Sequence, residues 1–129
     1  MAERYLIDTS VVIKYLNASI SADSLSKLDQ IIDQESRISF ITEIELQVWN
    51  PSNPDDMAIY QEFVASSLVI GIDSNIIRET IRIRKHYRIK LPDALIAATA
   101  LVNDLVLVAD NDKDYEKVSD LKYINPAKN

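Results

Sequence analysis

Two hydrophobic patterns alternate along the chain. Short apolar runs that favour strands are followed by stretches with apolar residues every three or four positions, the spacing of a helix that buries one face. Strands are expected at residues 5–7, 37–41, 68–72, 105–109 and 123–124. Helices are expected at residues 11–16, 21–34, 42–49, 55–66 and 94–102, and a further, basic helix is expected to follow a cap at residues 73–75. Short connections between alternating strands and helices predict an α/β fold with a parallel sheet between layers of helices.

Two stretches late in the chain are expected to form its core. The small and almost uniformly apolar residues 94–102 predict a helix that is buried nearly all round. The unbroken apolar run at 105–109 is typical of a parallel strand covered on both faces. In the basic helix before them, the buried side is expected to consist of Ile76, Ile77, Thr80, Ile81 and Ile83.

Length and composition restrict the class of protein. A chain of 129 residues fits one domain, expected to span residues 1–129. It has no cysteine, which excludes disulfides, thiolate metal ligands and a cysteine nucleophile, and its single glycine excludes a glycine-rich phosphate loop. No apolar run approaches the roughly 20 residues that cross a bilayer, and the N-terminus lacks a basic signal region. We therefore expect a cytoplasmic protein without a membrane anchor.

The charge balance is acidic but uneven. The chain has 14 Lys and Arg against 20 Asp and Glu, a net charge of −6, which argues against blanket binding to nucleic-acid phosphates. Yet a basic segment lies at residues 78–90, and within it Arg82, Lys85 and Arg88 are candidates for contact with nucleic-acid phosphates. Such a segment is either the solvated face of a helix or a phosphate-contacting surface.

Carboxylates follow the ends of several predicted strands. They are Asp8 after the first strand, Glu45 after the second, Asp93 at the start of the buried helix, and Asp110, Asp112 and Asp114 after the fourth strand. In a parallel sheet the carboxyl ends of the strands share one edge, so these side chains are expected to converge there. Several carboxylates in one crevice repel one another unless a proton or a hard cation intervenes. Mg²⁺ or Mn²⁺ would relieve that repulsion and activate water for attack on a phosphodiester.

Each carboxylate also has an ordinary structural explanation. Asp8 or Ser10 is a favoured helix N-cap, and residues 42–45 match a capping box in which Thr42 and Glu45 bond reciprocally. Asp93 at a helix start suits the helix dipole, and each acid of residues 110–114 is compatible with a solvated turn. The coincidence of all these acids at strand or helix starts favours a site.

Four stretches, at residues 5–13, 38–46, 91–100 and 107–115, resemble the motifs of the PIN domain in order and spacing. More narrowly, the chain resembles VapC-type toxins of type II toxin–antitoxin pairs. The resemblance implies a three-layer α/β/α sandwich with a central parallel sheet of four to five strands. It also implies an endoribonuclease dependent on Mg²⁺ or Mn²⁺ that cuts tRNA or ribosomal RNA, forms a homodimer and is silenced by a small antitoxin.

The same resemblance implies roles for individual residues. Asp8 and Asp93 would be metal ligands, and Glu45 would act directly or through water. Thr9 and Ser10 match hydroxyl positions that brace the first acid.

The fourth motif departs from the family pattern. Ala109 replaces a threonine, and Asn111 stands where a fourth acid is common. Asn111 can still offer its carbonyl oxygen to a metal, while Asp114, Asp110 or Asp112 would supply the missing charge. This departure keeps open a second hypothesis, a PIN-fold binding or assembly module without strong catalysis. A third is a DNA-directed nuclease with the same carboxylates, which is disfavoured because no long insertion is present to clamp a duplex.

Overall fold

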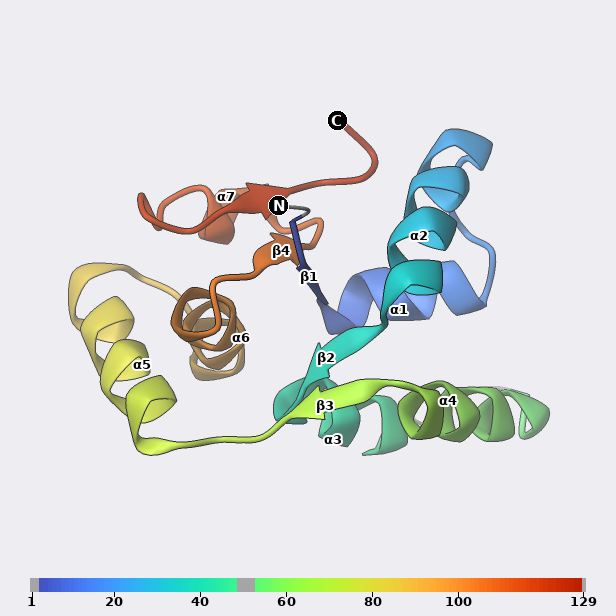
Figure 1. The fold of residues 1–129 in the computed structure, drawn as a ribbon, viewed down its shortest axis with the longest axis horizontal. Coiled ribbons are helices and arrows are strands. Elements are labelled where there is room, and N and C mark those ends of the chain that lie inside the picture. Colours follow the sequence, from blue (N-terminus) through green and yellow to red (C-terminus); the bar gives the residue numbers. More distant parts are fainter. Residues whose placement is uncertain (1–2, 49–52, 129) are drawn as a thin grey trace.

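The computed structural model describes residues 3–48 and 53–128; Trp49 of the predicted helix and the loop residues 50–52 lie outside this range. Within it, strands and helices alternate in the expected manner (Figure 1). The elements are β1 (Tyr5–Ile7), α1 (Thr9–Leu16), α2 (Ala22–Gln34), β2 (Arg37–Ser39), α3 (Phe40–Val48), α4 (Asp55–Ser66), β3 (Leu68–Ile70), α5 (Ser74–His86), α6 (Leu91–Val102), β4 (Val106–Val108), α7 (Asp112–Tyr115) and β5 (Tyr123–Ile124).

All strand pairings among the described residues are parallel, as expected. The sheet has two hydrogen-bonded parts, one in the order β1-β4-β5 and the other β2-β3. β1 and β2 are neighbours, so the two parts lie edge to edge. In register, Leu6 lies opposite Leu107 and Ile38 opposite Val69.

The second strand is shorter than its apolar run predicts. It ends at Ser39, whose hydroxyl accepts a hydrogen bond from the backbone N–H of Thr42 at 3.2 Å. Ser39 thereby satisfies a free N–H of the first turn, and Phe40 and Ile41 enter α3 instead of continuing the strand.

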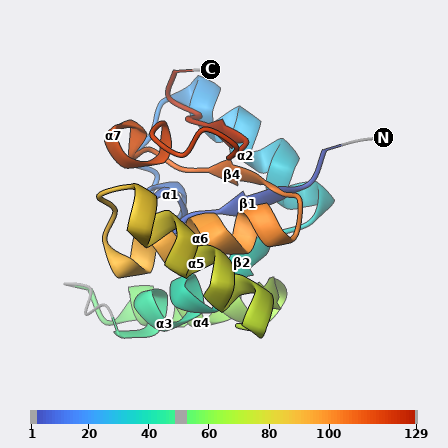
Figure 2. The ribbon, with the colours of Figure 1, turned by 90° about the vertical axis from the view of Figure 1, so that its left-hand side faces the viewer.

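Alternate residues of the central strands face two separate cores. Leu6 and Leu107 belong to a buried cluster with α5 and α6, whereas Ile7 and Val108 belong to a cluster with α1, α2 and α4. Figure 1 shows α5 and α6 on one side of the sheet and α1 and α2 on the other, and Figure 2 shows α5 and α6 from their own side. Both faces of the sheet are covered, which confirms the three-layer α/β/α prediction.

The small side chains of α6 allow α5 to pack closely against it, and both helices contribute to the same core. The expected buried side of α5 is only partly correct. Ile76, Thr80 and Ile83 are buried, but Ile77 is 47% exposed and Ile81 50% exposed. Positions i, i+4 and i+7 form one stripe toward α6, and each of the two exposed isoleucines is rotated by one residue from that stripe.

A helix that crosses a membrane must be both long and apolar. Across residues 3–48 and 53–128, none of the helices combines the length and the apolar composition that a membrane span requires.

Candidate active site at the carboxyl edge of the sheet

The junction of β1 and α1 places the first candidate acid. The backbone N–H of Asp8 donates to the carbonyl of Val108 at 2.9 Å, so Asp8 is still tied to β4 where β1 ends. Its own carbonyl accepts from Val12 and starts α1. Asp8 is the N-cap residue of α1, as one interpretation predicts, although its side chain makes no capping hydrogen bond; Ser10 lies inside the helix, so it is not the cap. Asp8 is only 7% exposed.

Three of the predicted acids line one pocket. A cavity of about 310 Å³ is lined by Asp8 from the end of β1, Glu45 from α3 and Asp93 from the first turn of α6. The remaining lining comes from α1, namely Thr9, Ser10, Ile13 and Lys14. Residues separated by more than 80 positions are therefore brought together at the carboxyl edge of the sheet, as the strand order predicts.

Electrostatics in this pocket, which we call the acid pocket, oppose ionisation of the acids. Burial, together with the nearby carboxylates of Asp93, Asp110 and Glu45, raises the pKa of Asp8 from 3.8 to about 7. The pKa of Asp93 is also raised, first by burial and then by Asp114, while a hydrogen bond from the Tyr115 hydroxyl at 3.4 Å partly opposes this. The acid pocket is short of positive charge.

The hydroxyl groups of Thr9 and Ser10 bond to two other acids, and not to Asp8 as the resemblance implies. Thr9 Oγ1 lies 2.7 Å from Glu45 Oε1 and 2.9 Å from the hydroxyl of Thr42, and Ser10 donates to Asp110 at 3.2 Å. These hydroxyls thus support Glu45 and Asp110, rather than bracing Asp8.

The capping-box interpretation of Thr42 and Glu45 is wrong as well. The helix begins at Phe40, so Thr42 lies in its first turn and Glu45 in its second. Glu45 therefore does not cap the helix. Its side chain lines the acid pocket, where it accepts a hydrogen bond from the Thr9 hydroxyl.

The fourth motif contributes residues at the edge of the pocket. Asn111 donates its side-chain amide to Asp114 at 3.0 Å and to Asp93 at 3.5 Å. Asn111 and Asp114 therefore adjoin Asp93, as the family pattern implies. In this arrangement the amide nitrogen of Asn111 faces the carboxylates, so presenting its carbonyl oxygen to a metal would require the amide to turn over.

The two remaining acids of this motif have different surroundings. Asp110 lies close enough to Asp8 to raise its pKa, and it pairs with Lys14 at the rim of the acid pocket. Asp112 instead bonds to Tyr123, Asn125 and Lys128, which lower its pKa to about 2. The structure brings Asp110 to the acid pocket and commits Asp112 to the C-terminal segment.

The candidate RNA-binding residues are not equivalent. Arg82 bonds to Glu79 at 2.6 Å and to Asp120 at 3.1 Å, so its charge is neutralised within the protein. Lys85 is exposed on α5, and Arg88 lines a separate surface pocket with Lys90. Lys90, at the start of α6, is near enough to Asp93 to lower its pKa slightly, which partly offsets the effect of burial.

A divalent metal fits the donor chemistry of the acid pocket. Its donors are carboxylate and amide oxygens, which suit Mg²⁺ or Mn²⁺, and the raised pKa values show that a positive charge would be stabilised there. In the part of the chain that the structure describes, no three His, Cys, Asp or Glu side chains are already gathered closely enough to enclose an ion. Such a site would therefore include water ligands, as Mg²⁺ sites usually do.

Sequence reasoning assigned no role to Lys14. It lines the acid pocket beside Ser10 and Asp110. The signal was present, because Ser10 and Lys14 are four residues apart and share one face of a helix that starts at Asp8.

The fold and the pocket define an α/β protein with an acidic pocket at the carboxyl edge of its sheet. The family model "PIN domain" matches residues 5–121, so the chain belongs to the PIN-domain family.

Solved structures with the same fold include toxin–antitoxin complexes. A toxin–antitoxin complex from Klebsiella pneumoniae is 25% identical, with a TM-score of 0.75 over 95% of this chain and 97% of that one. DNA-bound VapBC from Salmonella typhimurium is 20% identical, with a TM-score of 0.80 over 97% and 99% of the two chains. VapBC-1 from nontypeable Haemophilus influenzae is 20% identical, with a TM-score of 0.78 over 96% and 98%. A comparison with curated proteins gives no significant match.

Proposed function

We propose that this protein is a metal-dependent endoribonuclease and the toxin of a type II toxin–antitoxin pair, cutting structured RNA such as tRNA or ribosomal RNA. The observation that carries the proposal is the acid pocket, in which Asp8, Glu45 and Asp93 converge from different elements and the carboxylate of Asp8 is buried. Membership of the PIN family and the likeness to toxin–antitoxin complexes support a nuclease of the toxin class.

In this proposal each acid has a defined task. Asp8 and Asp93 hold Mg²⁺ or Mn²⁺, Glu45 acts on the metal directly or through water, and Asn111 with Asp114 completes the site. The metal supplies a positive charge that polarises water and offsets charge developing on the phosphate. Thr9 keeps the Glu45 carboxylate in one orientation through the 2.7 Å hydrogen bond. Burial of Asp8 strengthens its attraction to a cation, because the surrounding dielectric is low.

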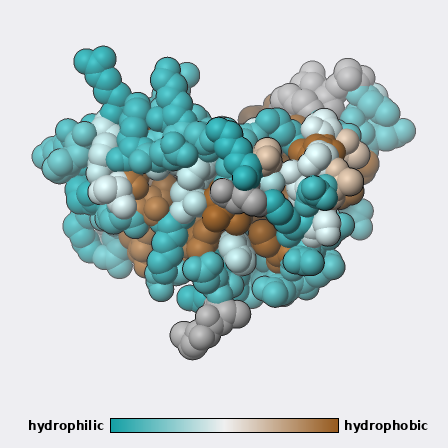
Figure 3. Space-filling model, turned by 90° about the horizontal axis from the view of Figure 1, so that it is seen from above, coloured by the Kyte–Doolittle hydropathy of each residue, from teal (hydrophilic) through white to brown (hydrophobic). Residues whose placement is uncertain are grey.

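The proposed partners are a small antitoxin and a second copy of the chain, in the cytoplasm. Several large apolar side chains are exposed, among them Ile44, Val48, Ile72, Ile77 and Ile81. A separate face, seen from the top of Figure 1, also has hydrophobic areas within a mostly hydrophilic surface (Figure 3). Exposed apolar surface of this kind is typical of protein–protein contacts.

A test of the proposed function compares induced expression of the wild type, Asp8→Asn and Asp93→Asn, with Asp112→Asn as a matched control at an acid outside the pocket. We expect growth arrest and discrete new RNA ends from the wild type and Asp112→Asn. Loss of a metal ligand should reduce cleavage by at least about a hundredfold, more than a supporting residue would.

The purified proteins are then given RNA and DNA of the same mapped sequence, with and without Mg²⁺ or Mn²⁺. Cleavage of DNA in preference to RNA would favour the DNA-nuclease alternative. Soluble, folded wild type that cuts neither nucleic acid would favour the binding module, which the replacement of a fourth acid by Asn111 supports.

A further inference from the structure

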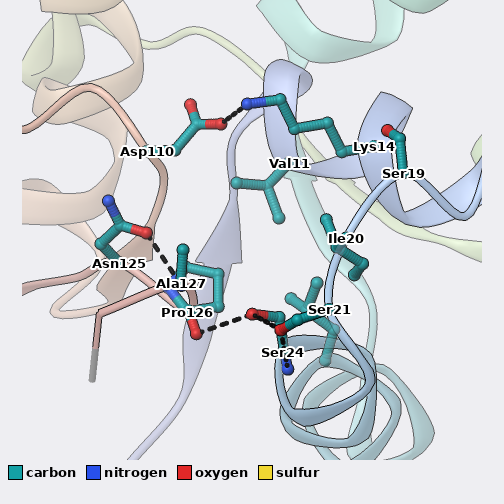
Figure 4. A pocket seen from close by; sticks show the side chains of 11 residues that line it. Val11, Lys14, Ser19, Ile20, Ser21, Ser24, Asp110, Asn125, Pro126 and Ala127 are labelled. Atoms are coloured by element: carbon teal, nitrogen blue, oxygen red, sulfur yellow. Dashed lines mark hydrogen bonds and ion pairs between the residues drawn. The ribbon is translucent and has the colours of Figure 1, made fainter.

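Among the residues that the structure describes, Lys14 is the one cationic side chain that lines the acid pocket. The other lining residues of the pocket are three acids, two hydroxyl residues and one isoleucine. Lys14 also lines a neighbouring cavity of about 330 Å³ between α1, the start of α2 and the C-terminal segment (Figure 4). Lys14 therefore lies between the two cavities, and a ligand in either cavity can contact it.

The ammonium group of Lys14 is held by one carboxylate. It pairs with Asp110 (Figure 4). The same carboxylate oxygen of Asp110 also accepts a hydrogen bond from the Ser10 hydroxyl. The Lys14 side chain is 48% exposed and that of Asp110 is 20% exposed. A half-exposed lysine in such a pair is held weakly and can reach another anion, while Ser10 continues to donate to Asp110.

A phosphate approaching the acid pocket needs such a cation. The pocket carries three carboxylates and the whole chain has a net charge of −6, so a nucleic-acid strand is repelled unless positive groups lie beside its path. Arg82 is neutralised by Glu79 and Asp120 and does not meet this need. On the side of the pocket formed by Asp93 the nearby cation is Lys90, and at the rim formed by Asp110 it is Lys14.

We propose that Lys14 binds a phosphate of the RNA strand next to the acid pocket, releasing Asp110 to the acid cluster when the strand is bound. The inference rests on the proposed function, because it takes the ligand of the pocket to be a nucleic-acid strand. It assigns Lys14 as a substrate-contacting residue and Asp110 as the carboxylate that holds Lys14 in place beforehand.

The test measures binding of a fluorescently labelled single-stranded oligouridine in Mg²⁺ over a range of salt concentrations. All proteins carry Asp93→Asn so that the strand is not cut. In this background Lys14→Met is compared with Lys27→Met, the same change on an exposed lysine of α2 that lines neither cavity. Loss of one phosphate contact should weaken binding and reduce the slope of log affinity against log salt by about 0.7, as expected for single strands. Lys27→Met should leave that slope unchanged, and Lys14→Arg should restore it.

A double variant separates phosphate contact from simple neutralisation of Asp110. If Lys14 contacts the strand, Lys14→Met with Asp110→Asn keeps the reduced slope. If Lys14 only screens Asp110, removing both charges returns binding to the level of the parent, and the inference is overturned. It is overturned equally if the parent protein does not bind oligouridine. Oligouridine binding by the Asp93→Asn parent, together with a wild type that cuts no RNA, would refute the nuclease while leaving the contact intact.

Discussion

Asp8 and Asp112 are aspartates at the same edge of one sheet, yet their surroundings are opposite. Asp8 is buried among other carboxylates, which together with burial raise its pKa to about 7. Asp112 is bonded to a lysine, a tyrosine and an asparagine, which lower its pKa to about 2. The difference separates an acid whose charge the protein leaves uncompensated from an acid whose charge it satisfies. Only the first creates a demand for an external cation.

This contrast predicts a large effect of pH on the metal-free protein. A raised pKa means that the contribution of Asp8 to stability is fully present below about pH 4 and is lost as the pH rises through about 7. The loss amounts to about 4 kcal/mol at most. In chelator, the wild type should therefore have a lower free energy of unfolding at about pH 8 than at about pH 5, and Asp8→Asn should reduce this difference. Urea unfolding at both pH values checks the prediction, and an equal pH dependence of the two proteins would contradict it.

A fourth acid should intensify the shortage of positive charge. Asn111→Asp removes two amide hydrogen bonds and adds a negative charge beside Asp93 and Asp114. We expect the metal-free protein to lose about 1–3 kcal/mol of stability, and Mn²⁺ to bind more tightly than to the wild type. Calorimetric titration with Mn²⁺ and urea unfolding in chelator measure the two effects. Weaker Mn²⁺ binding by the variant would show that position 111 is not part of the metal site.

The support of Glu45 should have a smaller effect. Thr9→Val keeps the shape of the side chain but removes the hydroxyl that donates to Glu45. We expect about a tenfold fall in kcat for RNA cleavage and a loss of about 1 kcal/mol of stability. Thr80→Val is the control, because its hydroxyl bonds to the Ile76 carbonyl on α5, away from the pocket. Equal falls in kcat for the two variants would show that the effect of Thr9 is only structural.

Asp112→Asn should have the smallest effect and the opposite sign to Asp8→Asn. Its depressed pKa means that the wild-type carboxylate contributes stability above about pH 4 and loses it as the pH falls toward about 2. The variant should therefore have a slightly lower Tm at neutral pH, a weaker dependence of Tm on pH in acid, and unchanged RNA cleavage. Thermal unfolding across the acid range tests this. A higher Tm for Asp112→Asn at neutral pH would contradict the assigned role.

The general layout was accessible to sequence analysis because it depends on local patterns. Strand and helix order followed from apolar spacing, and the convergence of Asp8, Glu45 and Asp93 followed from the shared edge of parallel strands. The start of α3 was misplaced because Ser39 and Thr42 are both good caps, and only the backbone geometry selects Ser39. That choice decides whether Glu45 caps a helix or enters the pocket.

Other features depend on contacts that no local pattern encodes. Arg82 is neutralised partly by Asp120, and Asp112 by Lys128, over separations of 38 and 16 residues. Which acid of the fourth motif faces the pocket was undecided for the same reason. The exposure of Ile77 and Ile81 likewise follows from where α6 lies against α5.

The most direct test of the account is the location of bound Mn²⁺ by anomalous scattering in crystals of the wild type. We expect a peak in the acid pocket, about 2.0–2.2 Å from carboxylate oxygens of Asp8 and Asp93, and no peak beside Asp112. A peak at Asp112 with none at Asp8 would contradict the account, because the protein would then be binding metal where its charge is already satisfied.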